Sequence, residues 1–347
     1  MPDRTPSAPL KTSWNTSRRQ WLLAACGGLA GAMQAPQVRA QAQAQTQTPS
    51  APAPAASRPP RIVVSFSILA DIVRSVAPAD AQVDSLVGPD ADAHVFEPSP
   101  VHGKRLAAAD LVVVNGLGFE GWITRLVKVS GYKGPLVEAA RGVQTLRATE
   151  ADGHDHAHAH AHDPAHGAGG AVDPHAWQDP RQVVRYVANL GEAFIQRWPE
   201  RRAEIEQRVR QQTAALQALD AALRQRLAAI APGQRRVITS HDAFGYLGRA
   251  YQIQFLAPQG WATHSEPSAA AVARLIRQIK ARQARALFVE NISDRRMIDR
   301  IAQEAKVGVG GALYSDALSA PGGPADSYER LMRHNVESIA RALEQAR

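Results

Sequence analysis

Short apolar runs alternate with amphipathic stretches from residue 61 to the end of the chain. Runs rich in Val, Ile and Leu predict buried strands, and apolar residues spaced three or four apart predict helices. The expected strands are 61–66, 82–87, 111–114 and 136–137, then 236–239, 253–256, 286–289 and 307–313. The expected helices are 68–76, 99–109 and 121–129, then 243–251, 268–281, 294–305 and 326–346.

This pattern predicts an α/β fold of two βα lobes. Continuous apolar strands that alternate with helices are typical of mostly parallel sheets covered on both faces. A chain of 347 residues also exceeds what one mixed core usually organises. We expect an N-terminal lobe at 61–198, a connecting helix at 199–230 and a C-terminal lobe at 231–347.

The connecting segment carries a helical pattern without interruption. It has no glycine, and its single proline stands at the start, where a helix tolerates it. At 1.5 Å per residue a helix here would be about 45 Å long and would form a stiff link. Its apolar residues recur every three or four positions: Leu216, Leu219, Leu223, Leu227 and Ile230.

The N-terminal 40 residues predict an export signal peptide. Arg18 and Arg19 precede an apolar run at 21–33, which is too short to span a membrane. Small residues at 38–40 offer a cleavage site. Both a Sec signal and a twin-arginine (Tat) signal fit this segment, because Arg18-Arg19 lies in a twin-arginine-like context.

Cys26 offers a third interpretation of the N-terminus, a lipid anchor. Leu23-Ala24-Ala25-Cys26 resembles a lipobox, although apolar residues continue beyond the cysteine. The following segment, 41–60, consists mainly of Gln, Ala, Pro and Ser and predicts a disordered tether. The expected location of the folded part is the periplasm.

Net charge and cysteine content limit which partners and which metal ligands the protein can have. The formal net charge is +8, but half of it lies in residues 1–40, and the remaining basic residues are scattered. Such a distribution does not favour nucleic-acid binding. The only cysteine is Cys26, so the predicted mature chain has neither a disulfide nor a thiolate. A metal site would have to use His, Asp and Glu.

Four candidate ligands are expected near the carboxyl ends of predicted strands, one of them after the irregular segment that ends the sheet of the first lobe. They are His94, His175, His241 and Asp316, two from each half of the chain. Ligands of open α/β sheets bind outside the carboxyl ends of the strands, so these four should meet in the cleft between the lobes. Each has an ordinary alternative as a loop, turn or helix-capping residue.

Three imidazoles and one carboxylate form a complete tetrahedral set for Zn²⁺. Four protein ligands close the site, which suits binding rather than catalysis. An exported zinc-dependent hydrolase remains an alternative, but it would need an open position for water and a general base. The chain contains no H-E-x-x-H motif.

Several motifs resemble the zinc/manganese solute-binding proteins of ABC transporters. The segments at 92–98 (DAHVFEP), 173–177 (DPHAW), 240–246 (SHDAFGY) and 314–318 (YSDAL) match the four ligand segments of that family in order, and 115–122 (NGLGFEGW) matches a further family segment. The resemblance implies two βα lobes, a connecting helix and a metal held between the lobes. By similarity the ligands are His94, His175, His241 and Asp316. It also implies delivery to an inner-membrane permease by a non-catalytic protein, expected to be a monomer. Some relatives have been described as adhesins.

Zinc is the expected ion. Manganese-type members usually carry a carboxylate at the third ligand position, where this chain has His241. Three imidazoles favour a borderline ion over the harder Mn²⁺, although Cu²⁺, Ni²⁺ and Co²⁺ could bind in vitro.

A histidine-rich segment, 150–172, precedes the second ligand. It has no apolar core residues and predicts a mobile loop. Zinc-type members commonly have such a loop, and we expect weak auxiliary zinc capture there; compositional drift is the alternative. Its histidines are His154, His156, His158, His160, His162 and His166.

Further side chains are expected to support the site. A ligating histidine normally donates its second N–H to a carboxylate, carbonyl or water. Glu120, Glu266 and Glu290 are candidates for that part, and surface or capping positions are their alternative. Trp177 and Trp261 are expected to be packing residues.

Overall fold

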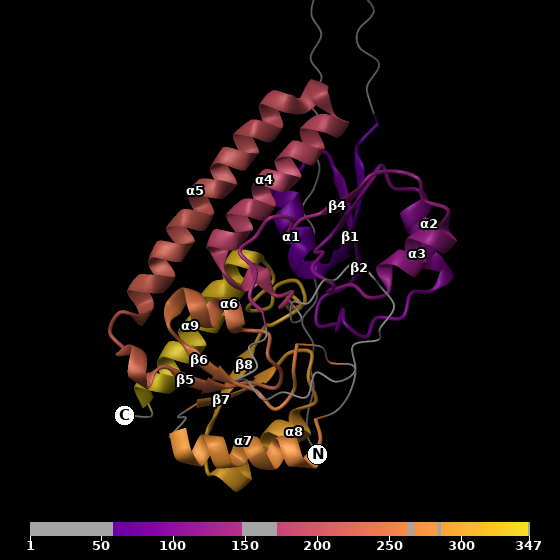
Figure 1. The fold of residues 1–347 in the computed structure, drawn as a ribbon. Helices are drawn as coiled ribbons and strands as arrows, with labels where there is room; N and C mark the ends of the chain where they lie inside the picture. Colours follow the sequence, from indigo (N-terminus) through magenta and orange to yellow (C-terminus); the bar gives the residue numbers. More distant parts are fainter. Residues whose placement is uncertain (1–57, 148–171, 262, 264–266, 283–285, 346–347) are drawn as a thin grey trace, which may run out of the picture. The chain divides into compact units, whose positions relative to one another are not determined.

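The computed structural model describes residues 58–147, 172–261, 263, 267–282 and 286–345. The predicted signal peptide, nearly all of the predicted tether and the six histidines of the histidine-rich segment lie outside these ranges. The described residues form two four-stranded sheets with helices (Figure 1). The predicted α/β class with two mostly parallel sheets is confirmed, and every strand pair within the sheets is parallel.

The N-terminal sheet has the strand order β2-β1-β3-β4. Strands β1 and β3 lie at the centre of this sheet, and nearly all of their residues, most of them apolar, are buried. Its strands are β1 (Arg61–Phe66), β2 (Gln82–Val87), β3 (Leu111–Val114) and β4 (Leu136–Glu138). The helices between them are α1 (Ser67–Val76), α2 (Pro100–Ala107) and α3 (Ile123–Ser130).

The C-terminal sheet repeats this order as β6-β5-β7-β8. In both sheets the first strand along the chain therefore has neighbours on both sides, which creates a switch point at the carboxyl ends of the strands. The strands are β5 (Arg236–Ile238), β6 (Gln254–Leu256), β7 (Ala286–Glu290) and β8 (Val309–Leu313). The helices are α6 (Gly245–Tyr251), α7 (Ala269–Arg282), α8 (Arg295–Ala305) and α9 (Tyr328–Gln345).

One helix, α4 (Pro180–Arg197), was not predicted from the sequence. The Asp179 carboxylate accepts a hydrogen bond from the Arg181 backbone N–H, and Pro180 occupies the first turn, where its missing N–H costs nothing. The buried face of α4 follows the helical period through Val183, Tyr186, Val187, Leu190 and Phe194. Both signals were available in the sequence.

The long helix α5 (Arg202–Leu227) follows α4 after a single 3₁₀ turn, η3 (Pro199–Arg201). It packs along α4 (Figure 1). The predicted helix at 199–230 is thus α-helical only over its central part. Beyond its end, the buried guanidinium of Arg235 donates to the backbone carbonyls of Leu227, Ile230 and Tyr251. These bonds fix the end of α5 to the start of the second sheet.

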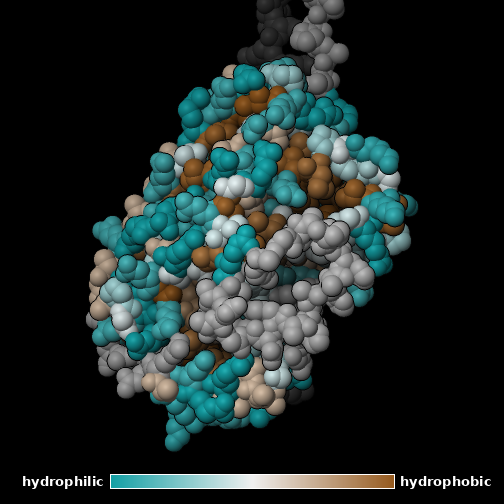
Figure 2. Space-filling model, in the orientation of Figure 1, coloured by the Kyte–Doolittle hydropathy of each residue, from teal (hydrophilic) through white to brown (hydrophobic). Residues whose placement is uncertain are grey.

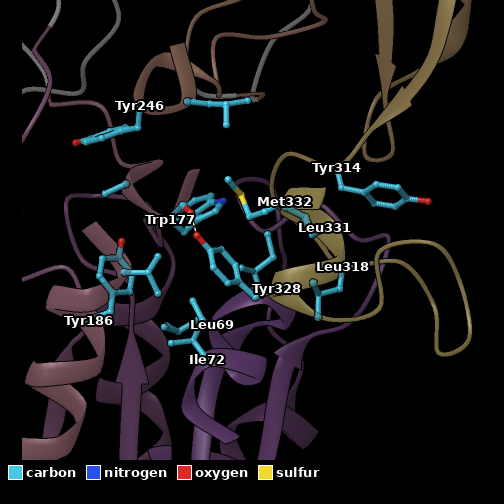
Figure 3. Packing of buried hydrophobic residues seen from close by; sticks show 14 of the residues in the cluster. Leu69, Ile72, Trp177, Tyr186, Tyr246, Tyr314, Leu318, Tyr328, Leu331 and Met332 are labelled. Atoms are coloured by element: carbon cyan, nitrogen blue, oxygen red, sulfur yellow. Dashed lines mark hydrogen bonds between the residues drawn. The ribbon is translucent and has the colours of Figure 1, made fainter. Parts of the chain in front are cut away.

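The largest apolar cluster contains side chains from both halves of the chain. Helix α9 contacts β8 and also reaches α1 and α5. Figure 3 shows Leu69 and Ile72 of α1 in one cluster with Tyr328, Leu331 and Met332 of α9, together with Trp177. Smaller clusters lie beneath α7 and α8 and beneath α2 and α3. The two sheets thus share a continuous core.

The outward surface of α5 is mainly hydrophilic (Figure 2). Its buried side carries the regularly spaced leucines, as the sequence pattern predicts. Among the described residues, no helix is long and apolar enough to cross a membrane.

Candidate metal centre

His94 lies in the loop between β2 and α2. Its backbone N–H donates to Asp92 Oδ1 at 2.8 Å, a local turn that sets the direction of the loop. Trp122 Nε1 donates to the Ala93 carbonyl at 2.8 Å, and the His94 ring meets Phe119 edge-on at 4.6 Å between centroids. Aromatic packing and the turn together hold the imidazole inward.

His175 is held by a carboxylate two residues earlier. Asp173 Oδ1 accepts from the His175 backbone N–H at 2.9 Å and lies 2.8 Å from Nδ1. Because this oxygen can only accept, it favours a proton on Nδ1 and a free lone pair on Nε2. The sequence analysis did not assign this role to Asp173, although the spacing Asp-x-His was visible in the motif.

His241 follows β5 and depends on Glu290, which ends β7. Glu290 Oε1 accepts from the backbone N–H groups of Ser240 at 2.7 Å and His241 at 2.8 Å. Glu290 Oε2 lies 2.5 Å from His241 Nδ1. Glu290 Oε1 therefore holds the backbone of His241 by hydrogen bonds, while Oε2 pairs with Nδ1 of the ring, and Nε2 lies 3.1 Å from Asp316 Oδ2.

Asp316 follows β8 in a buried loop. Tyr314 stands two residues before Asp316. Its backbone N–H donates to Asn335 Oδ1 of α9 at 2.9 Å, and its carbonyl accepts from Asn335 Nδ2 at 2.8 Å. The Ser315 carbonyl accepts from Trp177 Nε1 at 2.9 Å and Gln178 Nε2 at 2.7 Å. The segment that carries Asp316 is thus tied to the turn just after His175.

The structure brings the four predicted residues together. One nitrogen or oxygen from each of His94, His175, His241 and Asp316 can be chosen so that all lie within 4.8 Å of one another. His94 Nε2 lies 3.3 Å from His175 Nε2. Asp316 Oδ2 lies 3.2 Å from His94 Nε2 and 3.1 Å from His241 Nε2, and Asp316 Oδ1 lies 3.5 Å from His175 Nε2.

These separations suit a tetrahedral ion. Corners of a regular tetrahedron with bonds of about 2.0–2.2 Å lie about 3.3–3.6 Å apart. His241 Nε2 and both Asp316 oxygens are buried, yet they make no hydrogen bond of normal geometry. Buried polar groups normally have partners. A cation among the four residues would provide the missing partner.

The pKa shifts of His94 and Asp316 favour the protonation states that can bind a cation. Burial lowers the pKa of His94, which keeps its imidazole neutral, although Asp316 opposes the shift. Burial disfavours the charged form of Asp316, but the surrounding imidazoles hold the pKa of its carboxyl well below the usual range. At neutral pH the site therefore combines a neutral imidazole with an ionised carboxylate.

His241 is the exception. Burial opposes its charged form, yet the carboxylates of Glu290 and Asp316 outweigh burial and raise the pKa of His241 well above its ordinary value. A cation that binds the His241 ring would therefore compete with a proton.

The other predicted supporting residues differ in their positions. Glu290 contacts His241, whereas Glu120 accepts from Ser65 Oγ and the backbone N–H groups of Asn115 and Gly116. Burial raises the pKa of Glu120 to about 7 against these hydrogen bonds. Trp177 is buried and packs on His175, and Trp261 is half-buried. Glu266 lies outside the described residues.

Comparisons with known proteins agree with this fold and site. The family model described as "Zinc-uptake complex component A periplasmic" matches residues 62–342. The manganese-binding lipoprotein MntA of Halalkalibacterium halodurans is 27% identical over 285 residues, which cover 82% of this chain and 89% of that protein. The iron-binding protein YfeA of Yersinia pestis is 27% identical and covers 82% of this chain and 86% of its own length.

Among solved structures, the periplasmic zinc-binding protein TroA from Treponema pallidum superposes with a TM-score of 0.73 and 27% identity, over 82% of this chain and 99% of that one. Fold and site together define a solute-binding protein of an ABC transporter that binds a divalent metal, not an enzyme. The chain belongs to the family of periplasmic zinc-uptake component A.

Proposed function

We propose that this protein captures one Zn²⁺ ion with His94, His175, His241 and Asp316 and delivers it to an ABC importer. The observation that carries the proposal is the grouping of four buried side chains whose ligand atoms lie within 4.8 Å of one another, with separations of 3.1–3.5 Å between Asp316 and the three imidazoles. The ion is cargo, because four protein ligands leave no position for a reacting water.

Zinc is favoured by the donor set. Three imidazoles and one carboxylate suit a borderline ion, while Mn²⁺ prefers more oxygen ligands. The names of relatives do not decide the ion, since they include a manganese-binding, an iron-binding and a zinc-binding protein at the same 27% identity. Manganese is the second candidate, because both Asp316 oxygens face the site and a bidentate carboxylate would add an oxygen ligand.

X-ray absorption at the zinc edge tests the proposed coordination. The protein without residues 1–40, loaded with one equivalent of Zn²⁺, should show four nitrogen or oxygen neighbours at about 2.0–2.2 Å, with imidazole scattering. The same chain without residues 154–166 should give the same spectrum. A six-coordinate shell, or a spectrum that changes with the loop deletion, would contradict the assignment.

The histidine-rich segment is proposed as a weak auxiliary site. Histidines at alternate positions can hold zinc loosely and raise its concentration near the tight site. Removing the segment should then slow zinc capture at low zinc concentration and leave the final affinity unchanged.

The proposed setting is the periplasm. We infer export by a cleaved Sec or Tat signal within residues 1–40, with lipidation at Cys26 as the alternative. The proposed partner is an inner-membrane ABC permease, and we expect the protein to act as a monomer that does not bind nucleic acid.

A further inference from the structure

The four ligands differ in how they meet solvent. His175, His241 and Asp316 are fully buried, whereas His94 has 6% of its surface exposed. The next residue, Val95, is 47% exposed. Of the four ligands, His94 therefore lies nearest to solvent, and movement of the loop that carries it would open the site.

That loop is fastened to the C-terminal half of the chain by Asp90. Asp90 Oδ1 accepts from Asn291 Nδ2 at 3.0 Å, and Asp90 Oδ2 accepts from the Ala320 backbone N–H at 3.1 Å. The Asp90 backbone N–H donates to the Leu318 carbonyl at 2.9 Å. Both oxygens and the amide of one residue thus bind two loops of the second lobe.

A second carboxylate lies between Asp90 and His94. Asp92 Oδ2 accepts from Thr263 Oγ1 at 2.5 Å, and Asp92 Oδ1 accepts from the His94 backbone N–H. If Asp90 moved, the turn at Asp92 would move with it and would shift His94. The segment between Asp90 and His94 is short enough for the two residues to move together.

The partners of Asp90 are also connected to the site. Asn291 follows Glu290, the carboxylate that holds His241, and it also donates to the Ala317 carbonyl at 3.3 Å. Leu318 and Ala320 follow Asp316 closely in sequence. Asp90 therefore joins the His94 loop to two loops of the second lobe. One follows Glu290, which supports His241, and the other carries Asp316.

Asp90 has a backbone φ of 52°, in the left-handed region. Asp and Asn tolerate this region better than other residues with a side chain. Asparagine can therefore replace Asp90 without added backbone strain. Its amide group presents only one acceptor oxygen, so its NH₂ group would face either Asn291 Nδ2 or the Ala320 N–H, both of which are donors.

We propose that Asp90 is a positioning residue whose interlobe hydrogen bonds hold the His94 loop closed and set the rate at which the ion leaves. This inference rests on the proposed metal-binding function. We name the contacts of Asp90 with Asn291, Leu318 and Ala320 the Asp90 clasp. Opening of the Asp90 clasp precedes release of the ion, while the other three ligands keep their places.

The test is the rate of Zn²⁺ release into excess chelator, measured by stopped flow on the zinc-loaded protein. Asp90→Asn should release zinc about fivefold to thirtyfold faster, because it loses charge-assisted hydrogen bonds. Asn291→Ala should show a smaller acceleration. The acceleration in the double variant should be smaller than the product of the two single effects, because Asp90 and Asn291 share a hydrogen bond.

Asp84→Asn is the matched control. Asp84 is an exposed carboxylate on β2 of the same lobe, with a 3.6 Å ion pair to Arg105. It should leave the release rate unchanged, and the metal-free variants should keep the wild-type unfolding midpoint. The Asp90 clasp would be overturned if Asp90→Asn released zinc at the wild-type rate. It would also be overturned if the accelerations of the two single variants simply multiplied in the double variant. A wild-type protein without a tight zinc site would instead overturn the proposed function, and the clasp with it.

Discussion

Asp316→Asn should weaken Zn²⁺ binding by about 10²-fold to 10⁴-fold, the size expected when one partner of a buried charged cluster is removed. Asp316 is the only carboxylate among the four grouped residues, and its side chain is fully buried. Its oxygens lie 3.1–3.5 Å from the three imidazole nitrogens. Asparagine keeps the shape of the side chain but removes the charge that balances the cation.

Competition with a chelator of known affinity measures this loss. Asp299→Asn is a suitable control, since Asp299 lies on the exposed side of α8 and pairs with Arg295 one turn away. The control should bind zinc as the wild type does. Wild-type affinity in Asp316→Asn would show that the carboxylate is not a ligand and would remove one corner of the proposed tetrahedron.

Glu290→Gln should weaken Zn²⁺ binding by about 10-fold to 100-fold, although Glu290 is not a proposed ligand. The glutamine oxygen can still accept from the N–H groups of Ser240 and His241. Its NH₂ group, however, would face His241 Nδ1, where Glu290 Oε2 now lies at 2.5 Å. A donor at that position favours the tautomer with a proton on Nε2, the nitrogen that should bind the ion.

Two readouts separate this effect from a general loss of structure. The zinc affinity should fall while the unfolding midpoint of the metal-free protein changes little, and nitrogen NMR of the His241 ring should show Nδ1 without a proton and Nε2 with one. Glu304→Gln, on the exposed face of α8, provides the control. Unchanged protonation of the His241 ring together with unchanged affinity would mean that Glu290 supports only the backbone.

Much of the fold was accessible from the sequence because buried parallel strands are short continuous apolar runs. The predicted strands 61–66, 82–87 and 111–114 coincide with β1, β2 and β3. Helix α4 was missed although its cap and its apolar period are ordinary. It begins at Pro180, directly after the short 3₁₀ turn that follows His175.

The grouping of the four candidate ligands followed from their positions after strands, since the carboxyl ends of parallel strands share one edge of a sheet. The contacts that hold them could not be found in the same way. The bonds from Trp177 and Gln178 to the Ser315 carbonyl join residues more than 130 positions apart. Such pairs depend on how the lobes pack, and no local pattern encodes them. The contact of Asp173 with His175, by contrast, could have been predicted locally, because the two residues are separated by a single position.

The identity of the ion is the central claim, and competitive titration calorimetry tests it most directly. The metal-free protein, residues 41–347, should bind one Zn²⁺ per chain tightly and Mn²⁺ much more weakly, so that prior Mn²⁺ loading barely changes the zinc isotherm. Tight binding of Mn²⁺ that excludes zinc would contradict the assignment of the ion and leave metal transport in place. The absence of any tight site would contradict the account as a whole.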